Sequence, residues 1–186
     1  MGALHHTVIM SLDGYTADAD GKYDWAYPGD EVHAFVNDRE RSVRTHIYGR
    51  RMYEEMRVWE TVREGAGHDP VEVEFADVWR GIDKIVFSRT LPAVSTARTR
   101  LEREFAPQVV EEIKRSTDQD LSISGPTLAA HAVRAGLVDV YEAYVAPVVV
   151  GGGTRFLPDG VRLGLALVDE HRFDSGFVYL RYVPRS

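Results

Sequence analysis

Three junctions between an apolar stretch and a following turn constrain this chain most. They lie at residues 45–52, 84–90 and 121–127. Each runs from apolar residues into a turn that contains small or cationic residues, and parallel strands place such turns along one edge of a sheet, where ligands bind. A helix that begins there offers free N–H groups and a positive dipole end to a phosphate. Because Arg50, Arg51 and Arg89 lie in these turns, the pattern predicts a site for a multiply phosphorylated ligand such as a dinucleotide.

Composition and charge narrow the class of protein. The chain has 186 residues, enough for one domain with a substantial core. Its net charge of −7 and its scattered arginines argue against general nucleic-acid binding. No apolar run approaches the ~20 residues that span a bilayer, and the N-terminus lacks the pattern of a secretory signal. Cysteine is absent, which excludes disulfides and thiolate chemistry and is compatible with the cytoplasm.

Apolar runs, caps and turn signals alternate along the first two thirds of the chain. They predict strands at 4–10, 45–48, 82–87 and 121–124, and helices at 30–44, 50–59, 69–79, 101–116 and 126–135. Asp69 followed by Pro70 predicts the start of one helix, and Gly136 the end of another. Strands that alternate with helices predict an α/β chain with a mostly parallel sheet.

The C-terminal third has a different character. Residues 138–150 form one long β-rich run without an intervening helix pattern. Two further runs, 163–173 and 177–183, flank the turn signal Asp174-Ser175-Gly176 and predict a hairpin. The parallel sheet is therefore expected to end in an antiparallel edge. Long apolar strands at that end also predict a homodimer, because they offer an edge and a face for pairing.

Five blocks of sequence, in a fixed order, carry a family resemblance. They lie at 11–15, 49–54, 86–91, 136–139 and 146–153. Together they resemble the dihydrofolate reductase-like superfamily, and most closely the branch that includes the reductase domain of bacterial riboflavin biosynthesis. The likeness covers nearly the whole chain and implies a single dihydrofolate reductase-like domain over 1–186. It also implies a central, mostly parallel sheet of about eight strands with an antiparallel C-terminal hairpin, helices on both faces, and reduction of a heterocycle with NADPH.

The resemblance also implies where NADP(H) lies. The positions that it assigns to the cofactor are Leu12, Asp13, Gly14, Gly49, Arg50, Arg51, Met52, Ser88, Arg89, Thr90, Ser124, Gly125, Pro126, Thr127, Leu128 and Gly152. Within this set, 49–52 would contact the phosphates and 88–90 would hold the adenosine 2′-phosphate. Residues 124–128 would lie against the pyrophosphate and nicotinamide, and 12–14 would border the nicotinamide. The glycine run at 151–153 either approaches the cofactor or is a flexible strand end.

Two residues in this set bear on the cofactor independently. A 2′-phosphate favours a guanidinium that binds it with two hydrogen bonds, and Arg89 stands where one is needed. An NAD-preferring site would offer a carboxylate to the ribose, and none follows Phe87 directly. Pro126 is a departure, because relatives often have a second glycine near this turn and proline lacks an N–H donor. It also suits a first helical position, so the turn is expected to persist with one fewer phosphate contact.

Asp30 is the candidate catalytic residue. Trp25, Pro28 and Asp30 have the Trp-x-x-Pro-x-Asp spacing of true dihydrofolate reductases, in which the carboxylate anchors the pterin and helps its protonation. Hydride transfer to a C=N bond requires a proton at nitrogen, which gives a positioned acid a purpose. Glu31 is a rival for this role, and a purely structural alternative is that Asp30 caps the helix. Phe35 stands one position later than the phenylalanine usual in those enzymes.

The segment after the second main strand narrows the substrate class. Riboflavin-pathway reductases usually carry an Asp-Pro-x-Leu-x-x-Arg-like segment there, and this chain has Tyr-Glu-Glu-Met-Arg-Val-Trp at 53–59. We therefore expect a stand-alone reductase for a small pterin-like or pyrimidine-like heterocycle rather than the pathway enzyme. A second hypothesis is a non-catalytic NADP(H)- or nucleotide-binding protein of the same fold. No metal is expected, because the histidines include no pair at ligand spacing on a helix.

Overall fold

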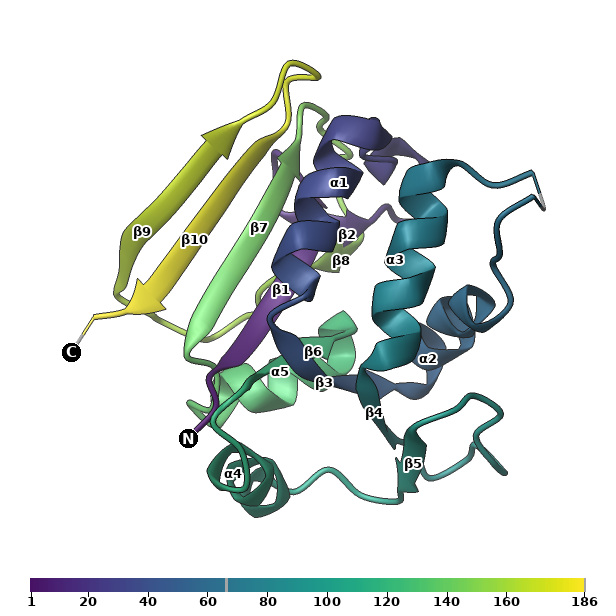
Figure 1. The fold of residues 1–186 in the computed structure, drawn as a ribbon. Helices are drawn as coiled ribbons and strands as arrows, with labels where there is room; N and C mark the ends of the chain where they lie inside the picture. The colour runs from purple at the N-terminus through teal and green to yellow at the C-terminus, as the bar shows by residue number, and fades with distance from the viewer. Residues whose placement is uncertain (66, 186) are drawn as a thin grey trace.

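An eight-stranded sheet forms the centre of the computed structural model, which describes residues 1–65 and 67–185 (Figure 1). Its strands are β1 (Leu4–Ser11), β3 (Val43–Gly49), β4 (Asp83–Phe87), β5 (Thr99–Glu102), β6 (Asp120–Ser124), β7 (Val140–Ala146), β9 (Leu165–Arg172) and β10 (Val178–Pro184). A separate two-stranded sheet pairs β2 (Tyr15–Ala17) with β8 (Thr154–Arg155). The helices are α1 (Gly29–Glu40), α2 (Arg50–Met56), α3 (Pro70–Gly81), α4 (Pro107–Arg115) and α5 (Pro126–Arg134), with short 3-10 turns η1 (Asp24–Ala26) and η2 (Arg57–Glu60).

The strand order confirms a mostly parallel sheet with an antiparallel C-terminal edge. Across the sheet the order is β5-β4-β3-β6-β1-β7-β10-β9. Each neighbouring pair from β5 to β7 is parallel, whereas β10 is antiparallel to both β7 and β9. The predicted hairpin is the pair β9 and β10, whose turn is closed by the N–H of Phe173 donating to the carbonyl of Phe177 (3.0 Å).

Helices cover both faces of the sheet, as expected. On one face Trp79 of α3 shares a buried cluster with Tyr48 of β3, and α1 runs beside α3 in front of the strands (Figure 1). On the other face Ala129 of α5 and Val110 of α4 share a buried cluster with Ile47. Ile47 and Tyr48 are neighbours in β3 and point to opposite faces, because successive side chains of a strand alternate. None of the helices in the described part of the chain has the length and apolar character needed to cross a membrane.

Local capping signals in the sequence are confirmed at two helix ends. Asp69 and Glu72 form a capping box at the start of α3, with Pro70 in the first helical position. At the end of α5, Gly136 has a φ of +67°, and its N–H donates to the carbonyl of Val133 (3.1 Å). These ends are set by contacts between residues close in sequence, which is why the sequence alone predicts them.

The helix predicted over 101–116 is wrong in its first half. Leu101 belongs to β5 and pairs with Val86 of β4, and α4 begins only at Pro107. A proline in a helix interior would remove a hydrogen bond and clash with the preceding turn, whereas it fits the first turn well. The proline was therefore a signal for the true helix start.

Other predicted elements are too long. The helix expected over 30–44 ends at Glu40, because Val43 already pairs with Asp120 in the sheet. The helix expected over 50–59 continues after Met56 only as a 3-10 turn. The β-rich run at 138–150 is a strand only from 140 to 146, and Pro147 follows its last residue. The short strands β2 and β8 were not predicted.

The carboxylate of Glu142 on β7 is buried and contacts side chains of β1. Glu142 is only 6% exposed, and its Oε2 lies 2.9 Å from Nδ1 of His5. The Thr7 hydroxyl donates to the same oxygen (2.9 Å), and the Tyr179 hydroxyl donates to the other. Burial alone would raise the pKa of Glu142, but the hydrogen bonds from His5 and Tyr179 outweigh it and lower the pKa to about 2. The ionised carboxylate therefore stabilises the fold.

Substituting Glu142→Gln is expected to lower the free energy of unfolding at neutral pH. The free energy of unfolding of the variant is also expected to change less between neutral and acid pH. The pKa of Glu142 falls from 4.5 to about 2 on folding, so the contribution is present above pH 4.5 and is lost as the pH falls towards 2. A difference of this size corresponds to about 3 kcal/mol. Urea unfolding at pH 7, 5 and 3 measures it, with the exposed Glu112→Gln as control. Parallel pH profiles of wild type and Glu142→Gln would contradict this account.

Candidate functional site

The central strand β1 extends beyond its neighbour β6, which opens the sheet at its carboxyl edge. β1 pairs with β6 only through residues 4–6 but with β7 through residues 5–11. Residues 4–6 are buried, whereas residues 7–10 are only half-buried although they belong to a central strand. The chain passes from β1 to α1 on one face and from β6 to α5 on the other. Such a change of direction is a topological switch point, where open α/β sheets bind ligands.

The three predicted junctions lie along this edge. Gly49 at the end of β3 pairs with Phe87 at the end of β4. Tyr48 of β3 pairs with Ser124, the last residue of β6. The parallel strands therefore end level with one another, and the prediction that these turns share one edge of the sheet is confirmed.

Side chains also connect the junctions. Arg50 donates from Nη1 to the hydroxyl Oγ1 of Thr90 (3.2 Å), which joins the first turn to the second. A Cβ built on Gly125 would lie 3.3 Å from the Cβ of Met52, so the first and third turns are in close contact. These contacts bring together residues that are distant in sequence.

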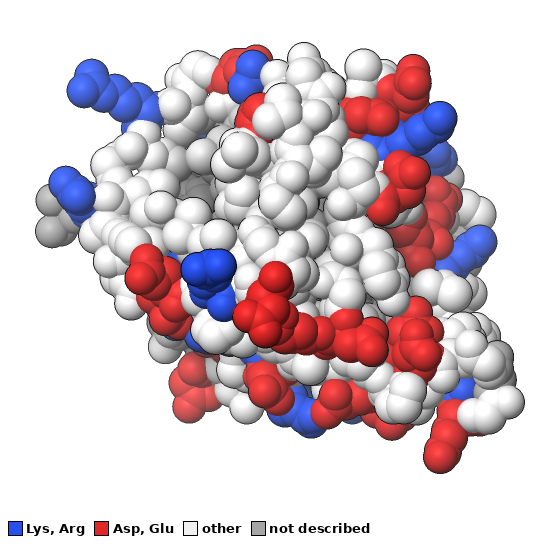
Figure 2. Space-filling view, turned by 90° about the horizontal axis from the view of Figure 1, so that it is seen from above, with Lys and Arg blue, Asp and Glu red and all other residues white. Residues whose placement is uncertain are grey.

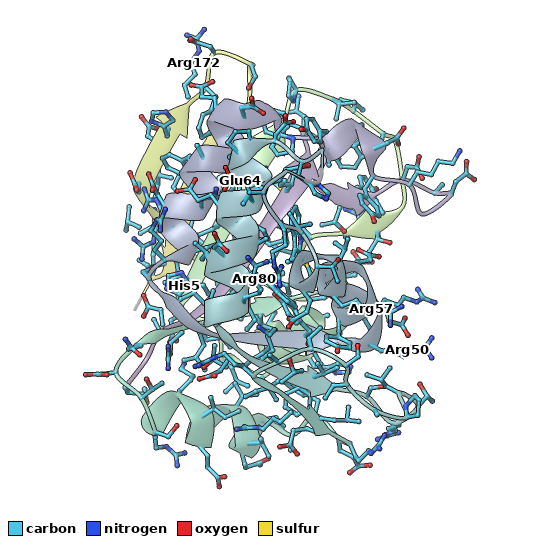
Figure 3. All side chains as sticks on the ribbon, turned by 45° about the vertical axis from the view of Figure 1, so that its right-hand side comes forward. His5, Arg50, Arg57, Glu64, Arg80 and Arg172 are labelled. Atoms are coloured by element: carbon cyan, nitrogen blue, oxygen red, sulfur yellow. The ribbon has the colours of Figure 1, made fainter. Side chains whose placement is uncertain are left out.

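Arginines at the start of α2 face solvent. Arg50 lies near the carboxylate of Glu54 (Nε to Oε1, 3.8 Å) in addition to its contact with the second turn. Arg51 is exposed and forms no ion pair with another described residue. Figure 3 shows Arg50 and Arg57 pointing outward on the same side of the molecule. This side of the carboxyl edge therefore offers guanidinium groups to an anionic ligand.

Ser88 shapes the turn that follows β4. Its hydroxyl oxygen accepts the N–H of Leu91 (2.9 Å) and of Thr90 (3.3 Å). Arg103 holds the same turn by donating to the carbonyls of Leu91 (2.7 Å) and Ser88 (3.4 Å). Because the Ser88 oxygen accepts two backbone N–H groups, Ser88 stabilises the conformation of this turn.

Arg89 is the most available cation of this turn. Its side chain is 77% exposed and pairs with the equally exposed carboxylate of Glu104 (3.1 Å). An ion pair between two exposed side chains contributes little stability in water. A phosphate that offers two oxygens competes well for such a guanidinium. The Arg89 guanidinium is therefore accessible to an anionic ligand, as the role predicted from the sequence requires.

The turn between β6 and α5 depends on a glycine. Gly125 has a φ of +96°, a conformation that side chains disfavour, and it stands directly before Pro126, the first residue of α5. Thr127 is exposed, whereas Leu128 is buried and lies 3.6 Å from a Cβ built on Gly49. Pro126 thus occupies the first helical position, as the sequence predicted.

The loop after β1 is joined to the glycine run after β7. The N–H of Leu12 donates to Val148 (2.8 Å), and the carbonyl of Gly14 accepts the N–H of Phe156 (3.0 Å). Asp13 accepts the N–H groups of Val150 and Gly151, and nothing lies within 4 Å of a Cβ built on Gly152. Residues 12–14 and 152 therefore form a second group at the carboxyl end of the sheet, beside the exposed part of β1.

Apolar side chains are exposed in the segments around this opening. They include Leu12 after β1, Val149 after β7, and Tyr23 and Tyr27 beside η1. Tyr23 lies near Glu55 of α2, whose negative charge raises the pKa of the Tyr23 phenol. Figure 2 looks down on the end of the molecule at which α1 begins and shows a broad surface without charged side chains, with acidic side chains around much of its margin. Such a surface suits a flat, uncharged ring.

Asp30 belongs to α1 and not to the turns and loops of these two groups. It is exposed in the first turn of α1 and lines an open groove between α1 and α3, together with Val71, Glu74 and Asp77. The helix cap is Pro28, and Asp30 makes no capping hydrogen bond, so the capping alternative is wrong. The role of Asp30 as a proton donor stays a prediction from the sequence.

Two neighbours of Asp30 have structural contacts. Glu31 accepts the N–H of Asp174 (3.1 Å), which ties α1 to the β9–β10 hairpin turn. His33 packs against Phe75, with ring centroids 5.5 Å apart, and burial lowers the pKa of its imidazole. Neither residue lies in a segment that the resemblance assigns to the cofactor.

The sequence did not single out the exposed part of β1. Thr7, Ile9 and Met10 read as ordinary strand residues, and their partial exposure arises only because β6 ends early. The pairing length of a strand depends on a distant segment, so no local signal could have found them. Within residues 1–65 and 67–185, no three His, Asp or Glu side chains are grouped to hold a metal.

Comparisons with known proteins agree with this architecture. The model of the RibD C-terminal domain family matches residues 3–179. The uncharacterized protein YyaP of Bacillus subtilis strain 168 is 25% identical over 177 residues, which covers 94% of this chain and 91% of that protein. The structure of RibD from Acinetobacter baumannii has a TM-score of 0.74 at 20% identity and covers all of this chain and 59% of its own. Dihydrofolate reductase from Enterococcus faecalis, solved with NADP(H), has a TM-score of 0.62 at 17% identity and covers 100% and 98%. The dihydrofolate reductase-like fold is confirmed.

Gly125→Ala is expected to destabilise the site and the fold together. Alanine at this φ would be strained, and its Cβ would press against Met52. A cost of about 1–3 kcal/mol corresponds to a fall in Tm of roughly 3–10 °C for a chain of this length. Differential scanning fluorimetry measures the shift, with the exposed Thr127→Ala as control. A Tm equal to that of the control would show that the turn tolerates a side chain.

Proposed function

The chain belongs to the RibD C-terminal domain family, and from that premise we propose that it is a cytoplasmic, NADPH-dependent reductase formed by a single domain. Its substrate would be a small heterocycle of the pterin or pyrimidine class. The observation that carries the proposal is the convergence of three turns, with Arg50 and Arg89 among them, beside the half-buried part of β1. Phosphate-binding side chains and an apolar opening are what a dinucleotide with a flat redox ring requires.

The residues at the carboxyl edge fit the cofactor. Residues 49–52, 88–90 and 124–128 would hold the adenosine half and the phosphates, with Arg89 on the 2′-phosphate. Residues 12–14 and 152 would border the nicotinamide. Two features support this assignment. The exposed Arg89 guanidinium pairs only with the exposed Glu104, and Gly125 has no side chain where the turn after β6 contacts Met52 in the turn after β3. When bound, NADPH supplies the hydride, and the chain orients the reacting rings.

The protein contributes binding and orientation at the substrate side. The exposed Leu12, Tyr23 and Tyr27 would cover the faces of a flat ring and exclude water from it. The sequence at 53–59 gives no phosphate-binding pattern of the riboflavin-pathway type, which favours a substrate without a ribosyl phosphate. We assign proton delivery to Asp30 as a proposal that rests on the sequence spacing alone.

The exposure of Asp30 favours a second candidate function. Its carboxylate lines an open groove between α1 and α3 rather than an enclosed pocket. A chain that binds NADP(H) without a positioned acid could act as a nucleotide-binding protein with no catalysis of its own. The two functions share the cofactor site and differ in turnover with a heterocyclic substrate.

Arg89→Ala is expected to weaken NADPH far more than NADH. Loss of a bidentate contact to the 2′-phosphate removes about tenfold or more in affinity, and NADH lacks that phosphate. Isothermal titration of wild type and variant with both cofactors measures this. Arg115→Ala is the matched control, because Arg115 is also exposed and pairs with a glutamate on α4. Equal losses for both cofactors would reject the 2′-phosphate role, and no binding of either to wild type would reject the reductase.

We also propose a homodimer that forms through β9. This edge strand exposes Leu167 (47%) and Val168 (53%), and an uncovered edge strand pairs readily with a second copy about a two-fold axis. Light scattering after size exclusion is expected to give twice the chain mass of 20.9 kDa for wild type. The double variant Leu167→Lys, Val168→Lys is expected to be monomeric, and Ala97→Lys, on a distant exposed loop, dimeric. A monomeric wild type would overturn the proposal.

A further inference from the structure

Two segments at the nicotinamide end of the proposed site are hydrogen-bonded to each other. The first follows β1 and covers 12–17, and the second runs from β7 to β8 and covers 147–155. Backbone bonds fix the second loop near its two ends, where Leu12 donates to Val148 and Ala17 pairs with Thr154. The intervening residues 149–153 form what we call the glycine arch. The conformation of the glycine arch therefore depends on the hydrogen bonds that its own residues form.

Asp13 holds the glycine arch with both oxygens of its carboxylate. Oδ1 accepts the N–H of Val150 (3.2 Å), and Oδ2 accepts the N–H of Gly151 (2.8 Å). No other described residue hydrogen-bonds to the arch. A hydrogen bond from Ser11, followed by those from the arch, lowers the pKa of Asp13, so the carboxylate is ionised at neutral pH. Hydrogen bonds from backbone N–H groups to an ionised acceptor are stronger than neutral ones.

The arch itself cannot keep this shape by side-chain packing. Gly151 and Gly153 have positive φ values of +77° and +127°. A Cβ on Gly153 would lie 2.1 Å from the carbonyl oxygen of Ala17, so the chain passes too close there for any side chain. Gly152 has open space around it. A segment of three glycines has high conformational entropy when free, so a polar tie has a large effect on its order.

We propose that Asp13 is a positioning residue, which fixes the glycine arch so that its backbone contacts the nicotinamide half of the cofactor. The inference rests on the proposed function, because it presumes that NADPH binds at this edge. It differs from the sequence-based expectation in the role of the side chain. Both carboxylate oxygens bind the protein backbone, so Asp13 acts through the arch rather than by touching the cofactor.

The test compares NADPH with 2′,5′-ADP, which carries the adenosine half and both of its phosphates but no nicotinamide. Asp13→Ala is expected to weaken NADPH by about tenfold or more, because the ring half binds a disordered arch, and to leave 2′,5′-ADP unchanged. Asp13→Asn keeps one acceptor oxygen and is expected to lie between the two. Asp18→Ala is the matched control, since Asp18 also accepts two backbone N–H groups, from Asp20 and Lys22, in the next turn.

Hydrogen exchange of 148–153 is the second readout and needs no ligand. It is expected to rise in Asp13→Ala and not in Asp18→Ala. Equal weakening of NADPH and 2′,5′-ADP by Asp13→Ala would assign a merely structural role and overturn the inference. Unchanged NADPH affinity, or unchanged exchange, would overturn it too. A wild type that binds neither ligand would instead reject the proposed function, together with this inference.

Discussion

The early end of the pairing between β1 and β6 is the constraint on which the site depends. β6 ends at Ser124 because Gly125 turns the chain towards α5, while β1 continues beside β7 for several more residues. A central strand normally has two neighbours and is covered along its whole length. Here one edge of β1 loses its neighbour, and residues 7–10 are only half-buried. The opening is a consequence of topology and needs no cavity in the core.

Close contact between the first and third turns then determines what surrounds the opening. Gly125 lies against Met52, and Gly49 lies near Leu128, so α2 and α5 begin almost in contact although they serve opposite faces of the sheet. This arrangement brings the cationic residues at the start of α2 to the turns after β4 and β6. A side chain at Gly125 would press against Met52 and strain the turn that lies between the groups that the proposed cofactor bridges.

The sequence predicts features that depend on contacts between residues close in sequence. It does not predict features that depend on contacts between distant segments. The capping box of Asp69, the hairpin turn at 174–176 and the shared edge of the three turns follow from local patterns and from the rule for parallel strands. Strand β5 was missed because its residues become a strand only by pairing with β4. The partners of Asp13 are 137 and 138 residues away in sequence, so its backbone contacts could not be inferred. The orientation of Asp30 depends on how α1 packs against α3, which spacing alone does not fix.

The fold of this chain therefore does not determine its chemistry, as in other folds that support many functions. Family membership fixes the sheet and the order of its strands, whereas the choice of the proposed substrate would depend on the few side chains around β1. Those side chains are mainly apolar, and exposed residues such as Leu12 and Tyr27 are unfavourable in water. Covering them with a ring regains roughly 25 cal/mol for each Å² of apolar surface removed from water. The exposed apolar surface would therefore favour binding of the proposed flat heterocycle.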